Sequence, residues 1–588
     1  MASSIQPPCV DVELTPWQRG QTFRELAPYF LLALFTGLFL FPFLRALAWN
    51  PDEGIYLYGA QITAQGAIPG RDFVELQGPG TFYWLALFFK IFGTSLFTAR
   101  SLLLFTGVAT AVLIFHLSRA IGATGLFAAI FVAATSLPLG VMNSPHYDSN
   151  LFALLSFSCF LYSIRRHALT AGRRIHGSML FFAGVLAGLT TCFLQQKGFY
   201  LTVAFVVTLR VLDRRAWLRP AAILAAAYAS VVLAEGFLYA AAKALPSLIY
   251  ANLIWPLSTY ESVNRAPYGF SLRESLWRGW FSSLHDGLPA PAAAIIATLF
   301  SLPYVLILIL PAVLPVMALR SRAIAFRRDV IPYWIAGYAL WASELHRWDL
   351  GHLRNGCVIL VVLFFALCEW PAGKARARIA FFITACLVLS AAGDVVGAST
   401  RNVALHTRRG TVYSLDRDHA LEFLLSRTKP GDAVFIYPYA PIYYFLADLR
   451  NPTRWSNLMY GINTGEQFRE AVNDLERKKV RYVLWDAVFS GQALSTLFPA
   501  YHHPPAPQQI MEPYLETHYH QIAFENGFRI LERNEIRRAD VAAALAQSPT
   551  APVPAAGFLR PARAEPMQSI ASMKTVLPET AHAPGKIR

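Results

Sequence analysis

The sequence predicts a polytopic α-helical membrane protein with a C-terminal external α/β domain. Apolar residues make up 55% of the chain and charged residues only 15%, whereas soluble domains carry about 25% charged residues. Apolar runs of roughly the length needed to cross a bilayer recur from Ala27 to about Val396. Short β-branched and aromatic runs, separated by amphipathic segments, replace them afterwards.

The positions of arginine indicate how these runs are oriented, because short cytoplasmic loops are enriched in Lys and Arg. Arg19 and Arg24 precede the first run, so we predict a cytoplasmic N-terminal tail over residues 1–26. About eleven spans are expected, over residues 27–48, 99–117, 125–142, 151–164, 179–194, 199–212, 221–241, 292–319, 331–341, 358–367 and 379–396. We expect a multi-pass protein of a bacterial inner membrane, with residues 27–400 forming its transmembrane domain.

Residues 49–98 form the first predicted external loop, and within it the run 82–92 follows a Gly-Pro-Gly turn. We interpret that run as a helix at the membrane interface. A periplasmic α/β domain is predicted over residues 411–536. Its expected strands are 433–437, 480–485 and 526–533, and its expected helices are 421–427 and 467–478. Residues 537–588 are rich in Ala and Pro without periodicity and are predicted to be disordered.

The formal net charge of +15 has a simple source in the cytoplasmic loops of a polytopic protein. Since no recognition module accompanies it, we expect no nucleic-acid partner. Phosphate-cradling Gly loops are also missing, which argues against a nucleotide-driven pump. No His, Asp or Glu spacing specifies a metal site, and a divalent cation remains open as a cofactor.

Carboxylates are concentrated directly after the first span, where Asp52, Glu53, Asp72 and Glu75 lie within residues 50–84. An isolated acidic pair at this place is often an ordinary solvated loop start. The second pair and the Gly-Pro-Gly turn favour a functional interpretation instead. A partly desolvated aspartate at the membrane surface can act as general base on an acceptor hydroxyl.

Other polar motifs are predicted on the same external face, namely NSPHYD from Asn143, QQKG from Gln195 and HRWDLGHLRN from His346. Asp148 is either a helix N-cap or a second functional carboxylate, and His146 is either structural or part of an acid–base network. The external cations either contact lipid head groups or bind the phosphate of a lipid-linked donor; they are Lys197, Arg347, His352 and Arg354.

Several of these motifs together resemble the GT-C membrane glycosyltransferases. The resemblance rests on the Asp52-Glu53 pair followed by Tyr56, on the run QGPGTFYWLALFFKIFGTSLFTARSLL from Gln77, and on HYDSNLFALLSF from His146. The most similar branch contains the protein O-mannosyltransferases and the lipid A aminoarabinose transferases. In layout, the resemblance covers about residues 27–400.

The resemblance implies a sugar donor carried on polyprenyl phosphate and transfer with inversion on the external face. Asp52 would deprotonate the acceptor hydroxyl, with Glu53 and Asp148 in support. Relatives often carry Lys at the position of Gln77, so another cation would bind the donor phosphate here; the candidates are Lys197, Arg347, His352 and Arg71. Four further residues would position the substrates, namely Tyr56, Glu75, Gln77 and His146.

Two alternatives remain open at this point. A transporter would show inverted internal repeats and midplane charges on broken helices, and neither is clear in the sequence. A ligase for lipid-linked oligosaccharides would use a large external loop with paired Arg and His, for which HRWDLGHLRN is the only hint. The acceptor hydroxyl belongs to a lipid, a protein or an envelope glycan, and neither it nor the donor sugar can be read from the sequence.

Overall fold

A computed structural model describes residues 16–47, 51–136, 142–169, 177–270, 272, 289–319, 322–370, 374–487, 489–490, 494–495 and 498–534. Residues Met1–Ile536 belong to one compact unit. The predicted disordered tail, most of the N-terminal tail and part of the loop between the seventh and eighth predicted spans lie outside the described residues.

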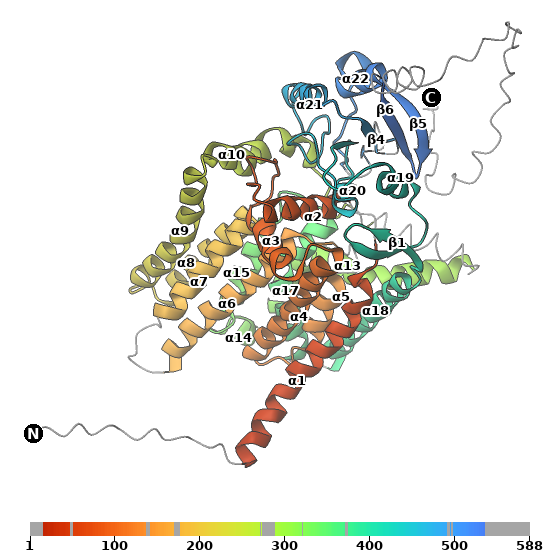
Figure 1. Cartoon of the computed structure of the whole chain (residues 1–588). Helices are drawn as coiled ribbons and strands as arrows, with labels where there is room; N and C mark the ends of the chain where they lie inside the picture. The colour runs from red at the N-terminus through yellow and green to blue at the C-terminus, as the bar shows by residue number, and fades with distance from the viewer. Residues whose placement is uncertain are drawn as a thin grey trace, which may run out of the picture. The chain divides into compact units, whose positions relative to one another are not determined.

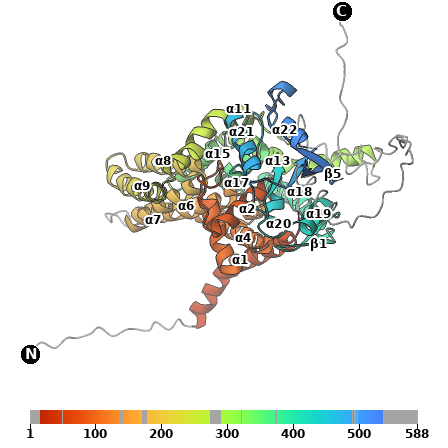
Figure 2. The same ribbon diagram turned by 45° about the horizontal axis from the view of Figure 1, so that its top comes forward.

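The first part of the chain is helical (Figures 1 and 2). Its helices up to the large external loop are α1 (Pro16–Leu40), η1 (Phe41–Leu44), α2 (Pro51–Ala64), α3 (Gly80–Phe92), α4 (Leu96–Ala120), α5 (Leu126–Ser136), α6 (Pro145–Leu169), α7 (Gly177–Phe193), α8 (Gln195–Leu212) and α9 (Leu218–Ala241). Short helical turns follow in the loop, namely α10 (Leu245–Ile249), η2 (Tyr250–Ile254), η3 (Pro256–Tyr260) and α11 (Glu261–Asn264). The remaining helices before the external domain are α13 (Ala290–Leu319), α14 (Arg322–Ala325), α15 (Ile331–Ser343), α16 (Leu350–Gly356), α17 (Val358–Glu369) and α18 (Lys374–Ser399).

Each predicted span falls on a helix, yet only some of these helices are long and apolar enough to cross a membrane by themselves. Among the described residues, five helices meet both conditions: Glu25–Leu44, Leu96–Ala120, Leu218–Ala241, Ser301–Leu319 and Arg376–Ser399. The pair α16 and α17 makes a sixth if it is one span bent by 67°. The chain is therefore a multi-pass membrane protein, and the predicted total of eleven spans stays a prediction.

The predicted external loop 49–98 contains a helix that the sequence interpretation did not include. Helix α2 begins at Pro51 and carries Asp52 and Glu53 in its first turn. Pro is favoured at the first helical position, and acidic side chains there are stabilised by the helix dipole. The polar residues that suggested a loop are therefore helix-start signals. The predicted helix over residues 82–92 is present within α3.

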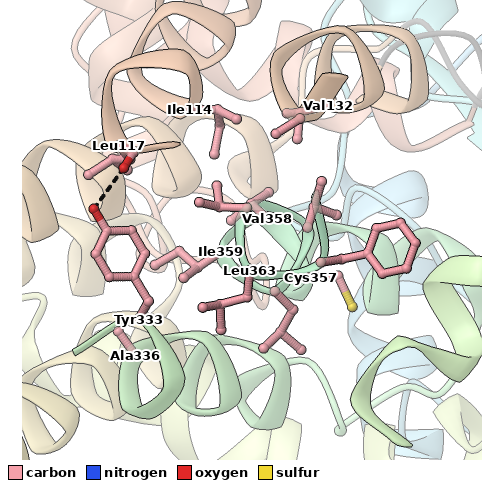
Figure 3. Close-up of a cluster of buried hydrophobic side chains, with 14 of the residues drawn as sticks. Ile114, Leu117, Val132, Tyr333, Ala336, Cys357, Val358, Ile359 and Leu363 are labelled. Atoms are coloured by element: carbon pink, nitrogen blue, oxygen red, sulfur yellow. Dashed lines mark hydrogen bonds between the residues drawn. The ribbon is translucent and has the colours of Figure 1, made fainter. Parts of the chain in front are cut away.

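Helix α17 forms the centre of the helical bundle. Every residue from Val358 to Cys368 is buried, as expected for a helix that is apolar on all sides. Figure 3 shows Val358, Ile359 and Leu363 packed among side chains from neighbouring helices. The Tyr333 hydroxyl at the edge of this cluster donates a hydrogen bond of 2.8 Å to the Leu117 carbonyl oxygen, so even the buried phenol is satisfied.

The C-terminal part is an α/β domain with a four-stranded sheet in the order β3-β4-β6-β5. Strand β3 (Val434–Tyr437) pairs in parallel with β4 (Tyr482–Asp486), whereas β6 (Phe528–Arg533) runs antiparallel to both β4 and β5 (Tyr519–Glu525). The accompanying helices are α19 (His419–Arg427), α20 (Ile442–Leu446), α21 (Gly465–Arg477) and α22 (Met511–His518). The predicted strands and helices are thus present within a few residues.

A β-hairpin spans the predicted start of this domain at residue 411. It consists of β1 (Val403–Thr407) and β2 (Gly410–Ser414). The backbone N–H of Leu47, just after the first span, donates to the carbonyl oxygen of Tyr413 at 2.8 Å. The hairpin therefore joins the first span to the C-terminal α/β domain, and the domain bounds 411–536 stay a prediction.

The C-terminal α/β domain packs directly on α2. A Cβ added to Gly54 would lie only 2.7 Å from the carbonyl carbon of Pro441, so the two backbones touch where α2 meets α20. Further along α2, the Tyr58 hydroxyl accepts a hydrogen bond of 2.9 Å from the backbone N–H of Asn451. Helices α2 and α20 lie side by side in both views (Figures 1 and 2). The start of α2 is thus enclosed by residues almost 400 positions later in the chain.

Candidate active site

Asp52 lies where α2 begins, between the helical bundle and the C-terminal α/β domain. The Tyr439 hydroxyl, from the segment that joins β3 to α20, donates a hydrogen bond to its Oδ1. Burial raises the pKa of Asp52 above its usual value, while the positive charges of Arg347 and His352 act in the opposite direction. The carboxyl is therefore partly desolvated, which is the environment of a general base.

The HRWDLGHLRN motif brings two of the predicted phosphate-binding side chains towards Asp52. Asp349 caps the N-terminus of α16 by accepting from the backbone N–H of His352 at 2.9 Å. The same carboxylate accepts from His352 Nδ1 at 2.8 Å and from Arg347 Nε at 2.5 Å. Burial opposes ionisation of Asp349, but His352 and Arg347 hold its pKa well below its usual range. Asp349 thereby fixes both cations in place.

Arg347 is held from a second direction by the loop between α9 and α13. Its Nη1 donates to Asn264 Oδ1 at 2.7 Å, and its guanidinium stacks on Phe498 with 5.1 Å between the guanidinium carbon and the ring centroid. The side chain is mostly buried, with 12% of its surface exposed. A planar guanidinium held on several sides is suited to the recognition of phosphate oxygens.

Glu53, predicted to support catalysis, faces the bundle and not the Asp52 side of the helix. Both of its oxygens accept from Arg100, with Nε–Oε1 at 2.7 Å and Nη2–Oε2 at 2.6 Å. The backbone N–H of Asn143 adds a third contact to Oε1 at 3.2 Å. Glu53 and Arg100 are each only 1% exposed. Their geometry anchors the start of α2 to α4.

Lys197, predicted to bind donor phosphate, is completely buried inside the bundle. Its Nζ lies 2.7 Å from Glu344 Oε1 and donates to Asn150 Oδ1 at 2.9 Å. Glu344 also contacts His146, whose Nδ1 lies 3.3 Å from Oε2. The ring centroid of His146 is 4.8 Å from that of His352. The predicted positioning residue His146 thus links the buried Lys197–Glu344 pair to the cations beside Asp52.

Three predicted positioning residues lie on the α2 side of the site. Tyr56 and Glu75 are buried, and burial raises the pKa of Glu75 to about 8 even though a hydrogen bond from Ser456 opposes the shift. Within the described residues, Glu75 Oε1 and Gln77 Oε1 are buried without a hydrogen-bond partner. Buried acceptors of this kind are expensive unless a ligand or water donates to them.

The other two predicted residues lie apart from this cluster. Asp148 is in the first turn of α6 rather than at its N-cap, and Thr106 Oγ1 donates to its Oδ1 at 3.4 Å. Arg71 is exposed and forms a two-point pair with Asp72, with both N–O distances at 2.8 Å. The Arg71–Asp72 pair neutralises itself at the surface.

A cavity lies inside the bundle next to Asp148. Its polar lining comes from several helices and comprises Thr106, Thr110, Thr135, Tyr147, Asn150, Arg354 and Asn355. Arg354, which the sequence placed among the external cations, donates to the Thr135 carbonyl oxygen at 2.7 Å and to the Tyr147 hydroxyl at 3.0 Å. Nowhere in the described part of the chain do three His, Cys, Asp or Glu side chains gather as potential ligands of a metal ion.

Four residues of the site escaped the sequence interpretation. Arg100 and Glu344 are charged residues next to or within apolar runs, and such charges need a buried partner, so their pairing was open to inference. Asp349 is the carboxylate inside a motif that was noted for its cations. Tyr439 had no local signal, because its partner Asp52 is 387 residues away.

The arrangement combines a partly desolvated carboxylate with the fixed basic side chains of Arg347 and His352, and with Glu75, one oxygen of which has no hydrogen-bond partner among the described residues. Such a set can remove a proton from a hydroxyl at Asp52 and stabilise negative charge on a leaving group beside Arg347 and His352. It needs no covalent intermediate on the protein.

No family model matches the chain, and no curated protein matches it. Among solved structures, the oligosaccharyltransferase from Archaeoglobus fulgidus in its apo form aligns with a TM-score of 0.50 at 12% identity, over 84% of this chain and 73% of that chain. The same archaeal enzyme, AglB, with an inhibitory peptide and a dolichol-phosphate gives a TM-score of 0.49 at 13% identity, over 85% and 73%. ArnT from Cupriavidus metallidurans bound to undecaprenyl phosphate gives 0.48 at 11% identity, over 87% and 98%. From its likeness to the apo oligosaccharyltransferase, the chain has the overall fold of that protein, as the resemblance of its sequence to the GT-C membrane glycosyltransferases led us to expect.

Proposed function

We propose that this protein is a membrane glycosyltransferase that moves a sugar from a polyprenyl-phosphate donor to a hydroxyl acceptor with inversion at the anomeric carbon. The observation that carries the proposal is the placement of Asp52 beside Arg347 and His352. A base for the acceptor and cations for the departing phosphate then lie within one enclosed site. The donor class is supported by the polyprenyl phosphates bound to the two solved proteins of similar layout.

In the proposed reaction the acceptor oxygen attacks the anomeric carbon and the bond from that carbon to the phosphate oxygen breaks. Asp52 receives the hydroxyl proton, and the bonding electrons leave with the polyprenyl phosphate. A lipid phosphate is already a fair leaving group, so the protein supplies mainly positioning, a base and electrostatic stabilisation. The raised pKa of Asp52 makes it a better proton acceptor than a solvated aspartate.

Among the four predicted phosphate-binding cations, we assign the role to Arg347 and His352. Their carboxylate partner Asp349 orients them without removing them from the site. Lys197 is paired with Glu344 in the bundle interior and Arg71 with Asp72 at the surface, and neither is among the groups that act on Asp52. These two cations are therefore assigned structural roles.

The substrate hydroxyls have candidate partners in Glu75 and Gln77. Each keeps a buried oxygen without a donor among the residues described, and a sugar or acceptor hydroxyl can supply that donor. At neutral pH Glu75 is largely protonated, since its pKa is about 8. A neutral Glu75 leaves Asp52 as the ionised carboxylate on this side of the site.

We place the active site on the periplasmic face of a bacterial inner membrane, with the N-terminus in the cytoplasm. This orientation follows from the arginine-rich loops on one side and the polar motifs on the other. The acceptor is a lipid, a protein or an envelope glycan with an accessible hydroxyl.

The proposal is tested by the transfer of labelled sugar from polyprenyl-phosphate donors in membranes that contain the wild type or Asp52→Asn. The substitution keeps the size and the hydrogen-bonding groups but removes the base, so transfer should fall about 100-fold or more while binding of polyprenyl phosphate persists. Asp72→Asn is the matched control because it changes an exposed carboxylate paired with Arg71.

The labelled product identifies the acceptor and shows whether one sugar or a whole glycan is moved. Equal transfer by the wild type and Asp52→Asn would refute Asp52 as the base. A wild type that transfers nothing from any polyprenyl-phosphate donor would refute the proposed donor class.

A further inference from the structure

The external domain contributes a side chain to the catalytic carboxylate itself. Tyr439 is buried, with 5% of its surface exposed, and its hydroxyl donates to Asp52 Oδ1. The residue lies between strand β3, which ends at Tyr437, and helix α20, which begins at Ile442. Its position is therefore set by the sheet of the external domain and not by the membrane helices.

Close contacts along α2 hold Tyr439 against Asp52. Gly54 is needed where the backbone of residues 441–442 approaches the helix, because any larger side chain would overlap it. Gln61 Nε2 donates to Asp448 Oδ1 at 2.9 Å, about two turns further along α2. The contact between this region and the C-terminal domain extends beyond α2, where the backbone N–H of Val74 donates to the Arg454 carbonyl oxygen at 2.9 Å.

These contacts all follow Tyr439 in the chain, and they involve backbone as well as side chains. A gate that swings away to admit substrate would have to break all of them together. The geometry therefore favours a fixed support for Asp52 over a removable lid.

We propose that Tyr439 is a positioning residue for Asp52, so that the external domain is an integral part of the catalytic site. This inference rests on the proposed function of Asp52 as a base. The phenol hydroxyl fixes the rotation of the carboxylate towards the acceptor and favours its ionised form by donating to it.

The electrostatic setting of Asp52 includes groups from several neighbouring elements. Arg347 and Asp349 act on it from the segment between α15 and α16, and His352 acts on it from α16. Tyr56 faces it from α2, Glu75 from the loop before α3 and Tyr260 from η3. Removal of the Tyr439 hydroxyl leaves these groups in place, so a change in the titration of Asp52 reports on Tyr439 alone.

The test is Tyr439→Phe, assayed for transfer against pH with the full-length protein in membranes. We expect kcat to fall by about 10- to 100-fold, the range for a lost hydrogen bond to a charged group, with little change in donor KM. The acid limb of the pH profile should move up by about one unit, because the carboxylate loses a donor that favours its charged form. Tyr443→Phe is the matched control, since Tyr443 lies in α20 and donates to Asp418 at 3.0 Å.

A second substitution guards against an effect of misfolding. Fluorotyrosine at position 439 keeps the shape of the side chain and makes its hydroxyl a stronger donor, so the acid limb should move down. Unchanged acid limbs in both Tyr439 variants, with Asp52→Asn inactive, would overturn the inference and leave the proposed function standing. Full activity of Asp52→Asn would overturn both.

Discussion

Glu53 offers the clearest separation of a structural role from a catalytic one. It follows Asp52 directly in the chain, yet its two oxygens are taken by Arg100 at 2.6 and 2.7 Å. Both partners are 1% exposed. The substitution Glu53→Gln keeps the shape of the side chain but leaves the Arg100 charge buried without an ionised partner.

The expected cost follows from that burial. Breaking a buried ion pair by removing one partner costs about 3–5 kcal/mol of unfolding free energy. Arg100 retains a hydrogen bond of 3.2 Å from Nη1 to the Phe43 carbonyl oxygen, which is too little to compensate a charge. We therefore expect Glu53→Gln to be strongly destabilised and Asp52→Asn, one residue away, to be nearly as stable as the wild type.

The difference in stability between the two variants is measured by thermal unfolding in detergent, with size-exclusion chromatography of heated samples as the readout. A double variant, Glu53→Gln with Arg100→Met, completes a double-mutant cycle. Removing both charges should recover much of the stability that Glu53→Gln loses. Any Glu53→Gln protein that remains folded should still transfer sugar at a rate close to that of the wild type.

The opposite pattern would refute the reasoning. If Glu53→Gln unfolds at the wild-type temperature but transfers no sugar, then Glu53 acts in catalysis, as the sequence first indicated. No recovery in the double variant would show that the pair is not the source of the instability.

Two further predictions concern the substrate side of the site. Burial raises the pKa of Glu75 to about 8. The stability that its protonated form contributes is therefore complete below its unfolded-state pKa near 4.5 and is lost as the pH rises through 8. Glu75→Gln should abolish this loss, which is on the order of a few kcal/mol, when the free energy of unfolding is measured between about pH 5 and 9. Arg347→Lys keeps the charge, but a lysine cannot contact Asp349 and Asn264 with one planar group. Competition assays should therefore show that the affinity for polyprenyl phosphate is weakened by about 10-fold. Unchanged affinity would exclude Arg347 from the phosphate site.

The sequence was most informative where a signal is local. Apolar runs predicted the helices of the bundle, and alternating β-branched and aromatic residues predicted β3, β4 and β6 to within a few residues. Asp52 stood out because acidic residues are rare in the apolar part of the chain. Helix α2 was missed because its polar start was interpreted as a loop, although Pro and acidic residues also begin helices.

Long-range pairings could not be read in this way. The sequence identified Lys197 as an exposed cation, but only the fold brings Glu344 and Asn150 to its ammonium group. Arg347 and His352 were identified, whereas their common partner Asp349 was overlooked inside the same motif. A residue's type thus indicated its chemistry, while its availability depended on neighbours from other helices.

The contact between α2 and α20 also determines when the site can form during synthesis. Asp52 leaves the ribosome 387 residues before Tyr439, and at about 5–20 residues per second the interval is roughly 20–80 s. During that time the first helices can enter the bilayer, but the carboxylate lacks the phenol that orients it. A nascent chain would therefore carry its donor-binding cations before its base is in place, and full activity would appear only after the last strand of the external domain has been added.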